Sequence, residues 1–420
     1  MHIGIFEDHL ARHFLPLTYF RPVYDLRCGI LTMRQRILAF LPAKNVTLFS
    51  RTYLGPLLRE ENPEAEFNTV PDEPCLLING RCIMTKKLVR ELRKNPEEDC
   101  VFVNGDDTVA IRLSSPNPNQ MTIDATHALL DFPQLASLKR MEVDATLVAY
   151  HWDLVQRNGE LINSDFQVIT GGGKRIRRSG KVHASAVLVG RKWISIGKKT
   201  EIGPGVVLDA TNGPIVIGSR VRIYPQAVIE GPCFVGDGAV IKIGAKIYGS
   251  TSIGPLCKAG GEVDHSILHA CANKQHDGFL GHSYIAPWVN LGAGTTTSNL
   301  KNTYGIIKVH VDGRLVDSGE MFVGLTAGDH VKTGINATLD TGSVIGPSSN
   351  VYGTTLPPKY IPAFSWGEAG AMETYGVEKA LDVAVRVMGR RQVSASAAYQ
   401  EVFRHVFAIT ENERTGHTSD

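Results

Sequence analysis

Branched aliphatic residues recur at every sixth position in the middle of this chain. The series, in which glycine follows several members, is Ile217, Ile223, Ile229, Val235, Ile241, Ile247 and Ile253. A period of six fits neither the 3.6-residue repeat of an α-helix nor the two-residue alternation of a half-buried strand. It fits a chain that turns a corner every six residues, with the aliphatic residue inside a triangular core and three such units in each coil. The repeat therefore predicts a parallel β-helix with strands stacked about 4.8 Å apart.

The β-helix is expected to occupy residues 182–356. Its six-residue register is uninterrupted to about Ile253, breaks at Pro255–His282 and breaks again at Thr295–Glu320. Segments that interrupt a solenoid become loops on one face, and function is often located there. Residues 357–420 are expected to form a C-terminal helical extension that caps the last coil. Its two amphipathic helices are predicted at Glu373–Gly389 and Ala395–Glu411.

Residues 1–150 have the pattern of an α/β domain. The expected strands are His2–Phe6, Val46–Phe49, Cys75–Ile78, Val101–Val103 and Val109–Leu113, the last two joined by a hairpin turn at Asn104–Asp107. Helices are expected at Ile30–Phe40, Lys86–Lys94, Asp131–Arg140 and Ala145–Asn158. Residues 151–181 are predicted to be a linker, since the glycine-rich and basic run Gly171–Gly180 lacks the spacing of a P-loop.

Composition excludes several classes of protein. The chain has 44 basic and 42 acidic residues, so its net charge of +2 gives no sign of a nucleic-acid partner. It has no run of 18 apolar residues, so neither a transmembrane helix nor a membrane partner is expected, and its start lacks the pattern of a signal peptide. Seven scattered cysteines without a Cys-x-x-Cys pair predict reduced thiols in a cytoplasmic protein.

The densest polar stretch of the sequence lies between Gly260 and Asn299. Its second part, His276–Asn299, resembles the acetyltransferase half of the bifunctional N-acetylglucosamine-1-phosphate uridylyltransferase / glucosamine-1-phosphate acetyltransferase family. In that family a His precedes the Asn of an Asn-Ile-Gly-Ala-Gly-Thr motif by fourteen residues, and a second Asn follows nine residues later. His276, Asn290 and Asn299 stand at those spacings. The later run Gly328–Asn336 resembles the related sugar nucleotidyltransferases that carry a β-helix tail, whose coils are left-handed.

The resemblance implies roles that are chemically reasonable. Acetyl transfer to an amine needs a base, and His276 would take the proton. Asn290 and Asn299 would orient the sugar and the thioester, although an Asn at a β-helix corner can instead form a structural ladder with its neighbours. The residues expected to bind the sugar phosphate or coenzyme A are Lys258, Glu262, Lys274, Lys301 and Lys332. Three family positions differ, because Asp264 replaces a Lys, and Phe279 and Leu300 replace Tyr.

The N-terminal region carries a second resemblance. Leu15–Thr32, together with Cys75–Arg81 and Tyr150–Val155, resembles the divergent nucleotidyltransferase domain of an alternative bacterial form of the same family. The usual Gly-rich triphosphate loop is missing, and Arg81 stands where a metal-binding Asp is expected. The arginines expected to contact nucleotide phosphates are Arg21, Arg27, Arg34 and Arg81. Structural ion pairs are the alternative for Arg21 and Arg27.

Together these features predict an α/β nucleotidyltransferase-like domain, a left-handed parallel β-helix and C-terminal helices. The expected function is sugar-1-phosphate nucleotidyl transfer and amino-sugar-1-phosphate N-acetylation in nucleotide-sugar synthesis of the UDP-N-acetylglucosamine type. The resemblance implies acetyl-CoA and Mg²⁺, sugar phosphate and nucleoside triphosphate substrates, and a homotrimer.

Two alternatives stay open. One is a trimeric metal-dependent hydratase of the gamma carbonic anhydrase type, because several His residues and a Cys lie close together in the sequence: His265, His269, Cys271, His276 and His282. Their spacing matches no standard closed zinc pattern, so no bound metal is expected. The other alternative is a non-catalytic sensor that binds a nucleotide sugar and regulates a partner.

Overall fold

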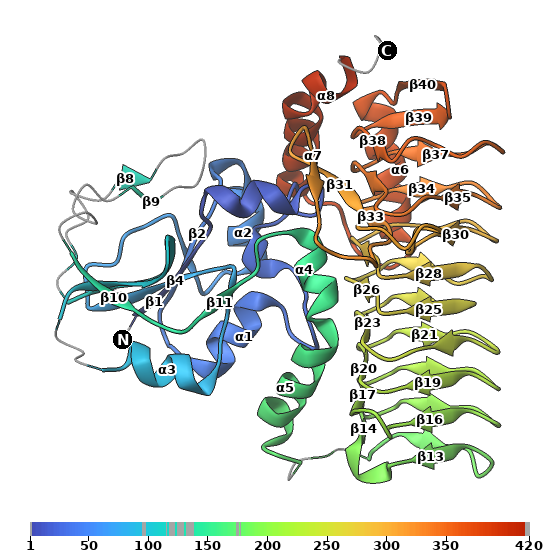
Figure 1. The fold of residues 1–420 in the computed structure, drawn as a ribbon, viewed down its shortest axis with the longest axis horizontal. Coiled ribbons are helices and arrows are strands. Elements are labelled where there is room, and N and C mark those ends of the chain that lie inside the picture. The colour runs from blue at the N-terminus through green and yellow to red at the C-terminus, as the bar shows by residue number, and fades with distance from the viewer. Residues whose placement is uncertain are drawn as a thin grey trace.

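The computed structural model describes residues 2–94, 98–114, 116, 122–123, 130–131, 138–173, 176 and 178–415. Figure 1 shows an α/β domain beside a tall stack of coils, with helices α4 (His151–Gln156) and α5 (Asn158–Thr170) running between them. None of the described helices has the length and apolar character needed to cross a membrane. All seven cysteines are free thiols, as the sequence predicts.

The N-terminal domain is built on a mixed seven-stranded sheet with the order β10-β6-β7-β4-β1-β2-β3. Its strands are β1 (His2–Phe6), β2 (Val46–Phe49), β3 (Glu66–Phe67), β4 (Cys75–Asn79), β6 (Cys100–Asn104), β7 (Asp107–Leu113) and β10 (Lys139–Glu142). The short pairs β5 (Cys82–Ile83) with β11 (Thr146–Leu147) and β8 (Thr122–Ile123) with β9 (Leu130–Asp131) are antiparallel. The domain's helices are α1 (Met33–Phe40), α2 (Gly55–Glu61) and α3 (Lys86–Leu92).

Most local predictions for this domain are confirmed. The strands β1, β2 and β4 and the antiparallel hairpin of β6 and β7 lie where the pattern placed them. The helix expected over Asp131–Arg140 is wrong at both ends, because Asp131 belongs to β9 and Arg140 to β10, while residues 132–137 lie outside the described part. Strand β10 forms here because Lys139–Glu142 extends the sheet in parallel beside β6. The predicted helix Ala145–Asn158 begins only at His151.

The second half is a β-helix with three faces, each a parallel sheet. Face 1 begins with β12 (Lys181–Val182), β15 (Glu201–Ile202), β18 (Arg222–Ile223), β21 (Val240–Ile241), β24 (Lys258–Ala259) and β27 (Asn273–Lys274). Face 2 contains β13 (Val187–Val189), β16 (Val207–Asp209), β19 (Val228–Glu230), β22 (Lys246–Ile247), β25 (Glu262–Asp264) and β28 (Phe279–Gly281). Face 3 contains β14 (Ile194–Ile196), β17 (Ile215–Ile217), β20 (Cys233–Val235), β23 (Thr251–Ile253), β26 (Ile267–Leu268), β29 (Tyr284–Ile285), β33 (Thr326–Ala327), β36 (Val344–Ile345) and β38 (Tyr360–Ile361).

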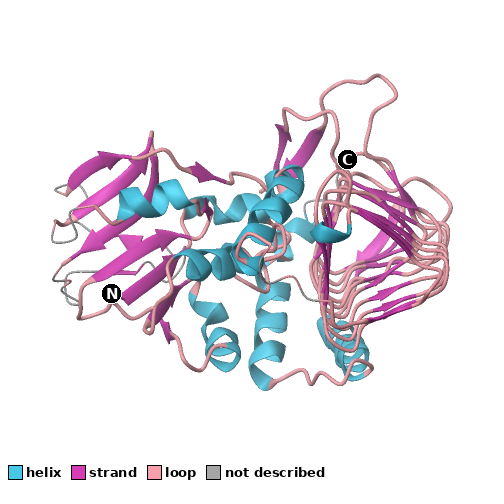
Figure 2. Cartoon of the chain, turned by 90° about the horizontal axis from the view of Figure 1, so that it is seen from below, coloured by secondary structure: helices cyan, strands magenta, loops and turns pink. Residues whose placement is uncertain are grey.

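The upper coils complete the solenoid. Face 1 resumes with β34 (Lys332–Thr333), β37 (Asn350–Val351) and β39 (Ser365–Glu368), and β40 (Ala371–Thr374) closes it as an antiparallel partner of β39. Strand β30 (Thr296–Thr297) pairs with β35 (Thr338–Leu339). Seen along the axis in Figure 2, the strands and corners of successive coils superimpose. Every member of the aliphatic series from Ile217 to Ile253 lies in the buried core of the coils. The predicted fold class, an α/β domain followed by a left-handed parallel β-helix and C-terminal helices, is confirmed.

Only one of the two predicted interruptions is a true insertion. Across Pro255–His282 the coils continue through five strands, β24 to β28. The number of residues per coil changes here, and the loops at the corners differ in length accordingly. Within Thr295–Glu320 the chain leaves the solenoid after β30, to form the antiparallel hairpin of β31 (Lys308–Val311) and β32 (Arg314–Asp317). Apolar side chains of this hairpin pack in one cluster with Trp152 of α4.

The segment predicted as a linker is largely helical and buried. Helices α4 and α5 occupy residues 151–170, and the apolar side of α5 packs on face 3 through Phe166. Asn158 fixes the start of α5, because its side chain donates to the Ser250 carbonyl at 2.7 Å and accepts from the Ser252 hydroxyl at 3.0 Å. Of the glycine-rich run, residues 174, 175 and 177 lie outside the described part.

The solenoid also extends past residue 356, where the sequence pattern placed its end, since β38 and β39 form further rungs. Helices α6 (Val377–Gly389), α7 (Ala397–Ile409) and α8 (Glu411–Thr415) follow. The first two match the predicted amphipathic helices. Buried residues of α6 and α7 pack in one cluster with Phe20 of the N-terminal domain and Phe364 of the β-helix, so these helices join both halves.

Candidate functional site at a corner of the β-helix

Polar side chains stack at the corner between faces 2 and 3. His265 follows β25 and His282 follows β28, and both adopt the left-handed backbone conformation, with φ of 40° and 46°. The strands below these corners are in register, with Asp264 opposite Gly281. Asn299 completes the stack one coil above His282, after 17 residues. We call Asp264, His265, His282, Asn299 and Phe322 the corner cluster.

His282 lies at the centre of the corner cluster. Its ring stacks on His265 with 4.8 Å between the ring centroids, and on the opposite side it stacks on Phe322 at 5.0 Å. The amide nitrogen of Asn299 lies 2.9 Å from Nδ1 of His282. Asp264 reaches Nδ1 of His265 at 2.7 Å. The cluster thus offers two imidazoles, one held by an amide and one by a carboxylate.

The environment of His282 favours its neutral form. Burial, with a smaller contribution from the neighbouring His265, lowers the pKa of His282 to about 4, although Asp264 acts in the opposite direction. A neutral imidazole has one lone pair with which to accept a proton. His282 is therefore uncharged at neutral pH, and it is only half-buried.

The structure does not bring together the three residues predicted to be catalytic. His276 is exposed on the turn between β27 and β28, at the corner between faces 1 and 2. Asn290 lies on face 1, where its side chain accepts from Asn273 at 3.3 Å. Asn299 alone lies in the corner cluster, and its partner is His282.

A spacing rule would have identified this partner. In this solenoid a residue lies above the one that precedes it by one coil, and His265, His282 and Asn299 are each 17 residues apart. The fourteen residues between His276 and Asn290 are not a full coil. The residue that sequence reasoning missed as the base candidate is therefore His282.

Face 1 carries a second set of polar residues, which we call the polar column. It stacks residues that are neighbours in the sheet register: Lys258, Asn273, Asn290, Lys332 and Asn350. Arg391, just after α6, donates to the Asn273 side chain at 2.6 Å. Burial lowers the pKa of Lys332 to about 8, and burial together with Arg391 lowers the pKa of Lys258. Two predicted lysines and Asn290 thus share one face.

The other predicted ligands of the β-helix lie apart from the polar column. Lys274 is buried and donates to the carbonyls of Gly260 and His276, so its contacts are those of a structural residue. Burial lowers the pKa of Lys274 to about 8. Lys301 donates to the Ile306 carbonyl within the insertion. Glu262 lies on face 2, with its carboxylate 4.0 Å from Lys246.

The four arginines predicted to contact a nucleotide are engaged inside the protein. Arg21 forms a bidentate pair with the buried Asp329 of the β-helix. Arg34 pairs with Asp25 at 2.6 Å, and the buried Arg81 pairs with Asp8 at 2.6 Å. Arg27 donates to backbone carbonyls. Arg21 follows the ion-pair alternative.

The described residues do not fit a magnesium site in the N-terminal domain. Asp8 follows β1, where sheet topology favours a ligand site, but its carboxylate is taken up by Arg81 and the Asn79 amide. Arg81 also lowers the pKa of Asp8, against the effect of burial. Within the described ranges, no group of three His, Cys, Asp or Glu side chains could hold a metal ion. Of the four His residues of the hydratase alternative, His265 and His282 stack at one corner, and His269 and His276 lie outside that cluster.

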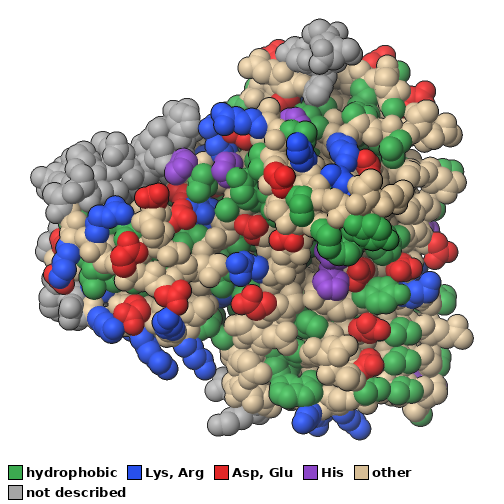
Figure 3. All heavy atoms as spheres, in the orientation of Figure 1, with side chains coloured by type: hydrophobic (Ala, Val, Ile, Leu, Met, Phe, Trp, Pro, Cys, Tyr) green, Lys and Arg blue, Asp and Glu red, His purple; other side chains and the backbone are tan. Residues whose placement is uncertain are grey.

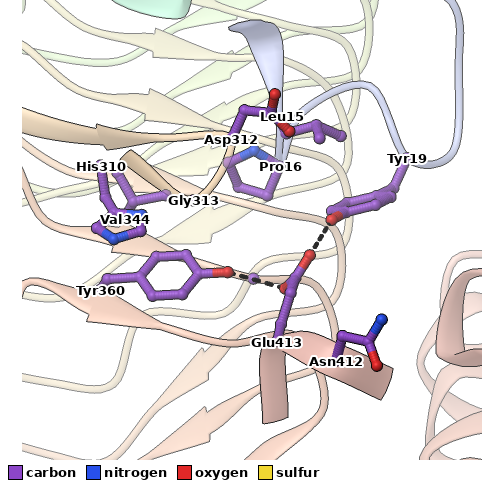
Figure 4. Close-up of a pocket in the computed structure, with 11 residues that line it drawn as sticks. Leu15, Pro16, Tyr19, His310, Asp312, Gly313, Val344, Tyr360, Asn412 and Glu413 are labelled. Carbon is purple, nitrogen blue, oxygen red and sulfur yellow. Dashed lines mark hydrogen bonds between the residues drawn. The ribbon is translucent and has the colours of Figure 1, made fainter. Parts of the chain in front are cut away.

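A cavity of about 430 Å³ lies where the N-terminal loop, the insertion hairpin, face 3 and α8 meet. Figure 4 shows Tyr19 and Tyr360 converging on Glu413 of α8, and both hydroxyls donate to its carboxylate. His310 stacks on Tyr360, and Asp312 lines the same space. With two carboxylates and no Lys or Arg in its lining, this cavity is a poor place for a phosphorylated substrate.

Hydrophobic side chains are exposed near the corner cluster. Figure 3 shows His side chains on the β-helix surface beside hydrophobic and acidic groups. The insertion supplies a run of exposed apolar residues: Tyr304, Ile306, Leu315, Met321 and Phe322. Exposed apolar surface next to a polar site is typical of a protein interface or a ligand groove.

Comparisons with known proteins match parts of this chain. Residues 3–174 match the family model of sugar nucleotidyl transferases. A bifunctional sugar-1-phosphate nucleotidylyltransferase/acetyltransferase from Sulfurisphaera tokodaii is 38% identical over 91 residues, which is 22% of this chain and 23% of the relative. The bifunctional protein GlmU of Acidithiobacillus ferrooxidans is 31% identical over 250 residues, covering 57% of this chain and 50% of the relative. The chain thus matches half or less of the length of these relatives.

Solved structures with some likeness include UDP-N-acetylglucosamine acyltransferases. That of Francisella novicida is 15% identical, covers 56% of this chain and 75% of its own, and has a TM-score of 0.28. The Arabidopsis enzyme is 14% identical, covers 58% and 98%, and has a TM-score of 0.27.

Proposed function

We propose that this chain, whose resemblance to the bifunctional nucleotidyltransferase/acetyltransferase family the comparisons confirm, is itself a transferase of nucleotide-sugar synthesis. The β-helix would acetylate an amino-sugar-1-phosphate with acetyl-CoA, and the N-terminal domain would join a sugar-1-phosphate to a nucleoside triphosphate. The observation that carries the proposal is the pairing of His282 with Asn299 on stacked coils of a β-helix that follows a sugar nucleotidyl transferase domain.

The corner cluster has the groups that acetyl transfer needs. The substrate amine attacks the thioester carbonyl, the C–S bond breaks, and coenzyme A leaves. His282 takes the proton that the amine loses and can return it to the departing thiolate. The Asn299 amide nitrogen donates to Nδ1 at 2.9 Å and fixes the ring, which places the ring proton on Nε2. For Nε2 to act as the basic atom, the amide must turn its oxygen toward Nδ1 and hold the proton there. The roles predicted for His276 and Asn290 stay predictions.

Substrate binding is proposed to use the polar column and the neighbouring surface. Lys258 and Lys332, with Arg391, supply positive charge on face 1, where coenzyme A or sugar phosphates would need it. The amines of Lys274 and Lys301 donate to carbonyls, as that of Lys332 does to His330, so Lys258 is the strongest candidate among the predicted lysines. Glu262, beside Lys246, is a weaker candidate. The exposed apolar run of the insertion is compatible with the homotrimer that the resemblance implies. The cytoplasmic location stays a prediction.

Support for nucleotidyl transfer comes from the match of residues 3–174 to the family model. The contacts of Arg21, Arg34 and Arg81 give no support to the phosphate-binding roles predicted for them, and those roles stay predictions. Mg²⁺ is the usual partner of a nucleoside triphosphate, yet the described residues do not form a site for it, so no step is assigned to the metal here.

The proposal is tested by mass spectrometry of the products formed from glucosamine-1-phosphate, acetyl-CoA, UTP and Mg²⁺. UDP-N-acetylglucosamine would support both activities. N-acetylglucosamine-1-phosphate alone would restrict catalysis to the β-helix, with the N-terminal domain as a binding module. If no sugar phosphate in a panel is converted while a nucleotide sugar binds tightly, the protein is a sensor and the transferase proposal is wrong. Hydration of CO₂ by zinc-loaded protein would favour the hydratase alternative.

A further inference from the structure

Arg27 is a buried cation without a buried anion beside it. Its side chain donates to the carbonyls of Ile30 and His269, and its guanidinium lies over the Phe234 ring at 5.3 Å. Within the described part of the chain, no carboxylate lies within ion-pair distance of Arg27. The Asp165 carboxylate accepts from Nε and Nη2 of Arg36. Burial lowers the pKa of Arg27. Asp165 raises the pKa of Arg27 at longer range without pairing with it. A buried charge whose direct contacts are all neutral is costly, so this arrangement calls for an anion.

The same guanidinium lines a cavity of about 430 Å³ between the two halves of the molecule. The N-terminal domain contributes Leu31 and Gln35, α5 contributes Ile169, and face 3 of the β-helix contributes Val216 and Phe234. The walls are therefore mostly apolar, with a few polar groups, which is the usual character of a small-molecule site of this size. This cavity lies apart from the corner cluster and from the cavity of Figure 4.

We propose that this cavity binds a small organic carboxylate, with the carboxylate group on Arg27 and an apolar body against Phe234 and Val216. A guanidinium matches a carboxylate in charge and in its two parallel donors. Asp237 lines the same cavity and disfavours ligands that carry a second negative charge, such as phosphate monoesters. The backbone of Arg27 is fixed to the β-helix, because its N–H donates to the Tyr284 hydroxyl at 2.9 Å. The ligand would therefore bridge the two halves, and its site is independent of the proposed transferase activities.

The test uses 4-fluorobenzoate as the probe and ¹⁹F NMR of the full-length protein as the readout. We expect wild type to broaden the probe resonance, with a dissociation constant below about 10 mM. Arg27→Gln should weaken binding about tenfold or more, because a charge-assisted pair is lost. Arg157→Gln is the matched control, since it removes one positive charge from the exposed end of α4. It should leave the probe signal unchanged.

A second cavity variant and a second probe test whether Arg27→Gln merely misfolds and which type of anion the cavity binds. Ile169→Trp narrows the cavity from the exposed side of α5 without touching Arg27, so it should also weaken binding. 4-Fluorophenyl phosphate should bind more weakly than 4-fluorobenzoate. Equal binding by wild type and both cavity variants, or no binding by wild type, overturns the proposal. Tighter binding of the phosphate ester overturns the carboxylate assignment.

Discussion

At the scale of single residues, chemistry in the β-helix depends on which side chains the coils stack. His282 has a polar neighbour above it and an imidazole below it, whereas His276 lies exposed at another corner. The sequence motif predicts His276, whereas the contact of Asn299 is with His282, because residues stack on one another only when they are one coil apart in the sequence. The role of His276 stays a prediction.

The pairing of Asn299 with His282 can be tested without an activity assay. Asn299→Asp places a carboxylate beside Nδ1, which stabilises the protonated ring and should raise the pKa of His282 from about 4 toward about 6. A histidine NMR titration measures this directly. Asn290→Asp makes the same chemical change in the polar column and should leave the His282 titration where it was. A shift of similar size in both variants would mean that the two residues are not in contact as described.

At the scale of elements, the helices between the two halves fit closely against the β-helix. A Cβ added to Gly159 of α5 would lie 2.2 Å from the Ser250 hydroxyl, while one added to Gly389 at the end of α6 would meet nothing within 4 Å. Gly159→Ala should therefore lower the free energy of unfolding by about 1–3 kcal/mol through overpacking. Gly389→Ala should raise it by up to about 1 kcal/mol through helix propensity. Urea denaturation of both variants gives the comparison, and a stabilising Gly159→Ala would refute the close fit.

Helix α4 should make the protein sensitive to acid. His151 is buried, with Nδ1 3.0 Å from the Thr326 hydroxyl on face 3, and burial lowers its pKa to about 3. Unfolded His has a pKa near 6.5, so below that pH the unfolded chain binds a proton that the folded protein does not. Stability is therefore lost progressively from pH 6.5 toward pH 3.

The contribution of His151 is measured by urea denaturation at about pH 7.5 and about pH 5. In His151→Phe, which cannot titrate, the loss of stability between these pH values should be smaller than in wild type by about 2 kcal/mol. The remaining pH dependence of the free energy of unfolding comes from other buried His residues. An identical loss in both proteins would show that His151 is not held neutral by the fold.

The elements that the sequence predicts correctly are those whose pattern lies within a short stretch of the chain. The six-residue series identifies the coils because each member must face the interior. Predictions failed where contacts between residues far apart in the sequence determine the structure or the role of a residue. Residues 151–181 read as a linker because nothing in them shows that Asn158 meets the Ser250 corner, 92 residues away. Arg21 could be read as a phosphate ligand because its partner, Asp329, lies 308 residues further along the chain.

At the scale of the whole molecule, buried pairs hold the two halves together. Arg21→Gln would leave Asp329 buried without its cation, and breaking a buried pair in this way costs about 3–5 kcal/mol. The variant should unfold at markedly lower urea concentration, or in two steps if the halves separate first. Arg404→Gln breaks the exposed pair with Glu378 and should not shift the midpoint measurably. Equal midpoints for the two variants would mean that the Arg21 pair does not join the halves.

Acetyl transfer at the corner cluster is tested by kcat/KM of His282→Gln and His276→Gln, measured with acetyl-CoA and the amino-sugar phosphate that wild type accepts. Loss of a general base should reduce kcat/KM of His282→Gln by about 10²–10⁴-fold. His276→Gln, which changes an exposed turn, should stay within about threefold of wild type. The reverse order, with His276→Gln inactive and His282→Gln active, would contradict the account.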